Sequence, residues 1–105
     1  PFTALIPPNS SYNVASVIVP RNDTSSYFHF IAWANEDKLG IETDAWRKFC
    51  VLVIGDDVDA NFRPIKRNAG NDYLQDRDLM ETGHFTGIPG IPNQDIAMWE
   101  SMGSI

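Results

Sequence analysis

The stretch NVASVIVPRNDTSSYFHFIAW, residues 13–33, decides the fold class of this chain. Its first part, residues 13–19, is rich in β-branched side chains, and its last part, residues 26–33, alternates between two faces, as strands do. Between them lies PRNDTS, residues 20–25, which consists of residue types that form turns. The stretch therefore predicts an antiparallel hairpin.

The second predicted strand has large apolar side chains on both faces. One face carries Tyr27, His29, Ile31 and Trp33, and the other carries Phe28, Phe30 and Ala32. A strand that is apolar on both sides is covered on both sides. We expect one face to pack against a helix and the other to be able to line a cavity.

A helix is predicted after the hairpin. The apolar residues that recur at helical spacing are Trp46, Phe49, Cys50 and Val53. Thr43 or Asp44 is expected to cap this helix, and Gly55 to end it.

The next segment, residues 56–70, mixes charge with Pro and Gly and predicts an irregular connection. Within it, Asp56, Asp57 and Asp59 lack the pattern of a calcium loop and are expected to form a solvated turn. A second helix is predicted over residues 71–82.

The last predicted helix is short, from about residue 94 to residue 102. Asn93 is the expected N-cap, and Gly103 the residue that follows the helix. Before it, residues 86–92 contain two Gly and two Pro residues, which prevents regular structure. Strands followed by helices make this an α+β fold, with an antiparallel sheet packed on helices.

Composition excludes several function classes. The 105 residues carry a net charge of −6, which argues against a nucleic-acid partner because phosphate binding needs clustered Lys and Arg. No apolar run approaches the ~20 residues that span a membrane. The one cysteine, Cys50, permits no internal disulfide, is expected in the core, and fits a reducing, cytoplasmic setting. His29 and His84 are too far apart in sequence to form a local metal-binding pattern.

Asp95 is the candidate metal ligand. It stands at the second position of the predicted last helix, where the helix dipole favours an ionised carboxylate, and such an oxygen suits a hard divalent cation. Met98, Trp99 and Met102 share its helical face, so a carboxylate directed inward would need a partner, for which a metal is one solution. The alternative is a surface carboxylate that only complements the dipole.

Three ordered motifs carry a family resemblance: NDYLQDR at residues 71–77, FTGIPGI at residues 85–91 and QDIAMWESMG at residues 94–103. Through them, residues 71–105 resemble the catalytic subunit of Rieske-type ring-hydroxylating oxygenases of the phthalate dioxygenase kind. The earlier residues are similar only in general character, as strands followed by a helix.

The resemblance implies a mononuclear iron(II) centre held by two His and one carboxylate, with open positions for oxygen. The carboxylate of the family lies in the QD element and maps onto Asp95, with Asn93 and Gln94 as candidates for hydrogen bonds to the site. The family's His-x4-His pair and its Rieske [2Fe–2S] domain have no counterpart in these residues. Residues 1–105 are therefore expected to be a partial C-terminal catalytic domain, inactive by itself.

The resemblance also implies a helix-grip (START-like) fold, in which an antiparallel sheet curls around a long helix and the substrate pocket lies between them. Tyr27, Phe28, Phe30 and Trp33 would supply core or pocket surface, and core is the favoured interpretation. The implied reaction is dihydroxylation or O-demethylation of an aromatic substrate with O2. Electrons would come from a Rieske cluster in a neighbouring subunit of a homo-trimer. A reductase or ferredoxin would supply that cluster with electrons.

Two other functions compete with this interpretation. One is a module of the same helix-grip fold that binds hydrophobic ligands without a metal, and the other is a structural remnant with neither site. A metal bound at Asp95 separates the oxygenase from both.

Overall fold

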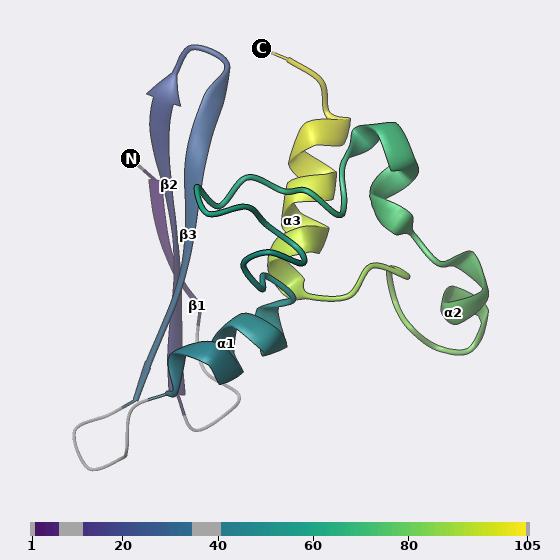
Figure 1. The fold of residues 1–105 in the computed structure, drawn as a ribbon, viewed down its shortest axis with the longest axis horizontal. Coiled ribbons are helices and arrows are strands. Elements are labelled where there is room, and N and C mark those ends of the chain that lie inside the picture. Colours follow the sequence, from purple (N-terminus) through teal and green to yellow (C-terminus); the bar gives the residue numbers. More distant parts are fainter. Residues whose placement is uncertain (1, 7–11, 35–40, 105) are drawn as a thin grey trace. The chain divides into compact units, whose positions relative to one another are not determined.

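The computed structural model describes residues 2–6, 12–34 and 41–104 (Figure 1). Three strands precede the helices, which confirms the α+β class. The chain divides into two compact units, residues 1–43 and 44–104. The first holds the sheet and the second holds the helices, so the packing of a sheet on a long helix, which a helix-grip domain requires, stays a prediction.

The first unit is a three-stranded antiparallel sheet. Its strands are β1 (Phe2–Ile6), β2 (Tyr12–Asn22) and β3 (Ser25–Ala34), in the order β1-β2-β3. The predicted hairpin is confirmed as β2 and β3, whose register places Val17 opposite His29. The sequence motif did not single out β1, which pairs along the other edge of β2.

The hairpin turn is shorter than the six residues predicted. Only Asp23 and Thr24 lie between the strands, because the Oδ1 atom of Asn22 accepts hydrogen bonds from the Thr24 amide at 3.0 Å and from the Ser25 hydroxyl at 2.8 Å. Pro20 lies inside β2, next to a register shift in the pairing. Such an irregularity tolerates a residue without an amide hydrogen.

The two faces of β3 differ in exposure. Tyr27 is 47% exposed, Ile31 47% and Trp33 41%, whereas Phe28 and Phe30 are only half-exposed or less and their rings lie 6.0 Å apart. The alternation predicted from sequence is therefore confirmed. The described residues of this unit leave Tyr27 and Trp33 partly exposed, so their interpretation as core residues stays a prediction.

Helix α1 (Thr43–Cys50) ends earlier than predicted. Val51 adopts a left-handed backbone with φ of 56°, its amide donates to the Lys48 carbonyl at 3.1 Å, and the Leu52 amide donates to the Arg47 carbonyl at 2.9 Å. This bond pair is the Schellman motif, which ends a helix and usually has Gly in the left-handed position. Val53 therefore lies outside the helix, and the expectation that Gly55 ends it is wrong.

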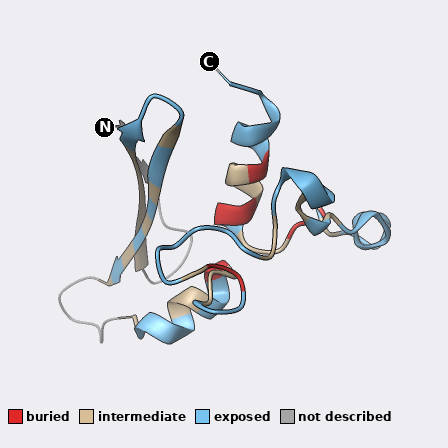
Figure 2. Cartoon of the chain, turned by 45° about the horizontal axis from the view of Figure 1, so that its top comes forward, coloured by how far each residue is buried: buried red, intermediate tan, exposed pale blue. Residues whose placement is uncertain are grey.

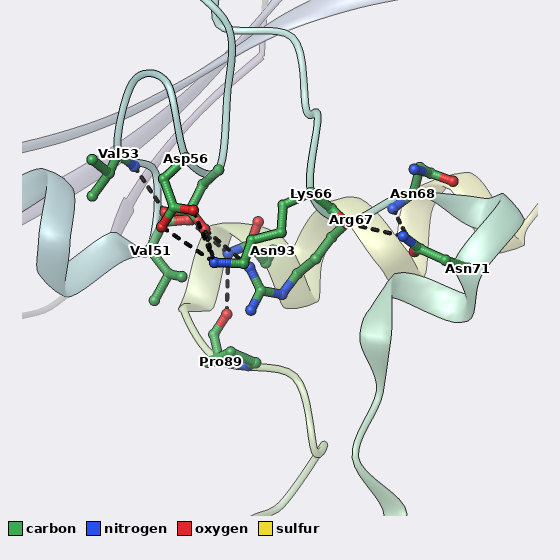
Figure 3. A network of polar contacts seen from close by, with 10 residues as sticks. Val51, Val53, Asp56, Lys66, Arg67, Asn68, Asn71, Pro89 and Asn93 are labelled. Atoms are coloured by element: carbon green, nitrogen blue, oxygen red, sulfur yellow. Dashed lines mark hydrogen bonds and ion pairs between the residues drawn. The ribbon is translucent and has the colours of Figure 1, made fainter.

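The connection over residues 56–70 is irregular, as predicted, but Asp57 is not solvated. Its side chain is 5% exposed and pairs with Arg67 Nη1 at 3.2 Å and with Lys66 Nζ at 3.6 Å. Its Oδ2 atom also accepts a hydrogen bond from the Val53 amide at 3.0 Å. Asp56, at 65% exposure, does lie in solvent, where it pairs with Lys66 Nζ at 3.2 Å (Figure 3). The predicted solvated turn is wrong for Asp57 because its cations lie about ten residues further along the chain.

The second predicted helix, residues 71–82, is broken. A 3-10 helix, η1 (Ala69–Leu74), and a short helix, α2 (Arg77–Glu81), take its place. Asp76 lies between them with an extended backbone, and its side chain accepts a hydrogen bond from the Leu79 amide at 3.0 Å. An N-cap needs that extended conformation, so the capping of α2 interrupts what periodicity alone predicts to be one helix.

The core of the second unit is small and partly polar. Figure 2 marks its buried residues in red: Cys50, Asp57, Val58, Gly87, Ile88, Pro92, Asn93 and Ala97. Cys50 is 2% exposed, which confirms its predicted core position, and burial raises the pKa of its thiol to about 11. Within residues 2–6, 12–34 and 41–104, no helix is both long and apolar enough to cross a membrane.

The two neighbouring carboxylates predict very different mutational effects. Asp57→Ala should lower the free energy of unfolding by about 3 kcal/mol, because it leaves the nearly buried Arg67 cation unpaired. Asp56→Ala, the matched control, should cost less than about 1 kcal/mol, as expected for an exposed pair. Urea denaturation measures both. Equal losses in the two variants would contradict a dominant role for the buried pair.

Candidate functional site

Asp95 lies on α3 (Ile91–Ser101), which begins three residues earlier than predicted. Gly90, with φ of 83°, is the residue before the helix, and Pro92 occupies a first-turn position, where its missing amide hydrogen costs nothing. Asn93 is therefore inside the first turn, and its prediction as the N-cap is wrong. Asp95 is the fifth helical residue instead of the second, so the helix dipole acts on it only weakly.

The two sides of α3 have different surroundings. Asn93 and Ala97 are both 8% exposed and form the packed side, while Met98 is 66% and Met102 73% exposed. At about 100° per residue, Asp95 lies with Met98 and Met102, roughly opposite Asn93. The predicted sharing of one face by Asp95 and these apolar residues is confirmed, and that face is not packed within this unit.

The carboxylate of Asp95 is partly desolvated and has no partner among the described residues: neither a hydrogen bond nor an ion pair reaches it there. Desolvation raises its pKa above the ordinary value of an aspartic acid. A desolvated carboxylate gains most from a bound cation, because the cation restores the electrostatic stabilisation that water supplied.

A metal ion at Asp95 would need further ligands. In the part of the chain that the structure describes, no three His, Cys, Asp or Glu side chains form a group that could hold a metal. His84 takes part in its own loop, where Nδ1 accepts a hydrogen bond from the Gly87 amide at 2.9 Å. Asp95 by itself fits one position of a centre with two His and one carboxylate, as a hard oxygen donor.

The side-chain amides of Asn93 and Gln94 do not bond to Asp95. Asn93 Nδ2 donates to the carbonyl oxygens of Val51 and Pro89, each at 3.1 Å (Figure 3). Gln94 Nε2 donates to the Ile88 carbonyl at 2.9 Å. Both amides hold the start of α3 against neighbouring backbone. Their predicted hydrogen bonds to the metal site stay a prediction.

The loop before α3 is fixed from the other side by the first of the three sequence motifs. Gln75 Nε2 donates to the Thr86 carbonyl and the Asp76 amide donates to the Gly87 carbonyl, both at 2.9 Å. Gly87 has φ of 68°, and a Cβ there would overlap the Asp76 carbonyl, so only Gly fits. In the sequence, Gln75 and Gly87 stand out only as members of motifs, and their local spacing carries no signal that these two segments meet.

The first motif also contacts the last. The Tyr73 hydroxyl donates to Glu100 Oε2 at 2.7 Å, across 27 residues of sequence, and joins η1 to α3. Residues 71–77, 85–91 and 94–103 therefore form one hydrogen-bonded network around the helix that carries Asp95.

Comparison with known proteins identifies the family of this chain. Residues 1–105 match the family described as "LigXa C-terminal domain like". The chain is 55% identical over 105 residues to the phthalate 4,5-dioxygenase oxygenase subunit of Pseudomonas putida, covering 100% of this chain and 24% of that protein. It is 32% identical over 118 residues to the 3-chlorobenzoate-3,4-dioxygenase oxygenase subunit of Comamonas testosteroni, covering 100% of this chain and 27% of that one. The resemblance inferred from the motifs is thus confirmed, and the chain spans about a quarter of the length of these curated relatives.

The contact between Tyr73 and Glu100 predicts an alkaline transition. Desolvation, and then the hydrogen bond and charge of Glu100, raise the pKa of Tyr73 to about 12. The folded protein thus favours the neutral phenol. The contribution of Tyr73 to the stability of the fold is therefore complete below about pH 10, the pKa of tyrosine in the unfolded chain. It is lost as the pH rises toward about 12, the pKa in the folded protein. Tyrosinate absorbance, taken as the difference between the protein and Tyr73→Phe, should show this late titration. Glu100→Gln should move it to lower pH, and an unchanged titration in that variant would refute the assigned cause.

Proposed function

Because the chain belongs to the family described as "LigXa C-terminal domain like", we propose that it is part of the oxygenase subunit of an enzyme that oxygenates aromatic compounds. The similarity to two oxygenase subunits, each over the whole of this chain, supports the proposal. The reaction is dihydroxylation or O-demethylation with O2. Its partners are an aromatic substrate and a reductase or ferredoxin that donates electrons, in a homo-trimer.

The single observation that carries the site is the carboxylate of Asp95, which is partly desolvated and has no partner among residues 2–6, 12–34 and 41–104. We assign it as the carboxylate ligand of a mononuclear non-haem iron(II) ion, with two His ligands from beyond these residues. Bound iron supplies the activation of O2, using electrons from a Rieske [2Fe–2S] cluster. The part of this chain is to hold the carboxylate in place, on the side of α3 that also carries the exposed Met98 and Met102.

The substrate pocket is proposed to lie between the sheet and a long helix, as in a helix-grip domain. The face of β3 that carries Phe28 and Phe30 is the less exposed one in the sheet unit and would supply its core or pocket surface. A helix-grip module that binds a hydrophobic ligand without metal has the same architecture. The presence or absence of a metal bound at Asp95 therefore distinguishes the two functions.

Replacement of Asp95 tests the proposal. In the complete oxygenase subunit, Asp95→Ala should abolish turnover and remove most of the iron. The fold should persist, since a helix carboxylate contributes at most about 0.3–1 kcal/mol through the dipole, and Asp95 lies beyond the first turn. Asp95→Glu should retain part of the iron with little turnover.

The matched control is Asp78→Ala, which removes an exposed carboxylate from α2. It should leave iron content and rate unchanged. Iron at the wild-type level together with a wild-type rate in Asp95→Ala would end the assignment and favour the metal-free module.

The substrate class gives a second test. Both relatives are named for an aromatic carboxylate, phthalate or 3-chlorobenzoate. We therefore expect the complete enzyme to couple O2 uptake to the conversion of benzoates and phthalates. Uncharged aromatic analogues should react more slowly, and sugars not at all. Oxygen uptake with product analysis measures this, and a preference for the uncharged analogues would contradict the expectation.

A further inference from the structure

Asn93 links three separate segments of the second unit through one side-chain amide. It is 8% exposed, and its single nitrogen Nδ2 donates to two backbone carbonyls, Val51 and Pro89, at 3.1 Å each (Figure 3). Val51 follows α1 and Pro89 belongs to the loop before α3. One buried amide thus joins the end of one helix, the loop and the first turn of the next helix, across 42 residues of sequence.

The acceptor at Val51 is held in one direction. A β-branched residue with φ of 56° is a rare and strained conformation, and it persists only where the surroundings determine it. The amide of Val51 donates one of the two Schellman hydrogen bonds at the end of α1, and the carbonyl of Val51 accepts a hydrogen bond from Asn93. The carbonyl therefore forms a rigid support for α3.

A second close contact lies beside the first. Gly90, with φ of 83°, has no room for a Cβ, because that atom would overlap the carbonyl oxygen of Cys50. The backbone at Cys50 and Val51 thus meets the start of α3 at two adjacent points, through Gly90 and Asn93. Two such points restrict both the distance of the helix from this backbone and its rotation about its own axis.

This restriction reaches Asp95 through the helix backbone. Asp95 follows Asn93 by two residues, on roughly the opposite side, and its own side of α3 carries the exposed Met98 and Met102. Because that side is not packed in this unit, the direction of the Asp95 side chain depends on how the other side is anchored.

We propose that Asn93 is a positioning residue for Asp95: its amide, bonded to Val51 and Pro89, sets the rotation of α3 and with it the direction in which the Asp95 carboxylate points. The inference rests on the proposed function, since it concerns the ligand assigned there. Groups that orient a metal ligand without touching the metal typically change metal affinity or activity 10–100-fold when replaced.

The experiment uses the complete oxygenase subunit with Asn93→Leu, which keeps the branched shape of the side chain but removes both N–H donors. Asn93→Ser, a smaller polar change, serves if the first variant folds poorly. Three quantities are measured: the rate of iron loss to a chelator, the electron paramagnetic resonance spectrum of the ferrous site with nitric oxide as probe, and the melting temperature of the iron-free protein. We expect about 10–100-fold faster iron loss and an altered spectrum in both variants.

The matched control is Val58→Ala, which removes packing from a side chain that is 3% exposed and whose residue accepts neither hydrogen bond of the Asn93 amide. It should lower the melting temperature of the iron-free protein while leaving iron loss and spectrum as in the wild type. Wild-type iron loss and spectrum in the Asn93 variants, with only a lower melting temperature, would overturn the proposal. The same conclusion would follow if Val58→Ala changed iron binding as much as they do.

Asp95→Ala in the same series separates this inference from the proposed function. Retention of iron in that variant would reject Asp95 as a ligand, and with it any positioning role. Loss of iron in Asp95→Ala together with wild-type behaviour of the Asn93 variants would reject only the role of Asn93.

Discussion

The ion pair between Asp57 and Arg67 is the interaction on which the second unit depends. The segment from Val51 to residue 68 contains no helix and no named strand, and its backbone pairing is limited to two isolated bridges and to hydrogen bonds within its turns. Asp57 supplies the missing anchor: its carboxylate bonds to the Val53 amide and pairs with Arg67 and Lys66, while its carbonyl accepts from the Ile65 amide. A buried carboxylate is tolerated only when it is satisfied in this way, because its desolvation is otherwise costly.

This anchor has consequences beyond its own loop. By ordering the chain after α1, it holds the reversal at Val51, whose carbonyl receives the Asn93 amide. The loop before α3 is held in turn by Gln75 and Asp76, and the far end of α3 by Tyr73. Short polar contacts, more than apolar burial, thus place the helix that carries Asp95, in keeping with a core that includes a carboxylate and an amide.

The same arrangement accounts for what α3 offers to the proposed oxygenase. One side of the helix is used for anchoring, and the other presents a desolvated carboxylate beside exposed methionines. A ligand that must keep a fixed direction is better supported from a rigid helix than from a loop, because the helix transmits the restraint of its packed side. The Gly- and Pro-rich loop contributes by allowing the close approach at Gly87 and Gly90, where no side chain would fit.

The sequence by itself determined the features that depend on near neighbours: the β2–β3 hairpin from its alternation, the core position of Cys50, the helical face shared by Asp95 and the methionines, and the family from three ordered motifs. Tertiary structure alone decided where α1 ends, why residues 71–82 break, how early α3 begins, and that Asp57 and Asn93 are buried. Each of these outcomes rests on a partner that is not a sequence neighbour or on a capping geometry that competes with periodicity. Arg67 lies ten residues from Asp57, and Val51 lies 42 residues from Asn93, separations at which hydrophobic periodicity carries no information.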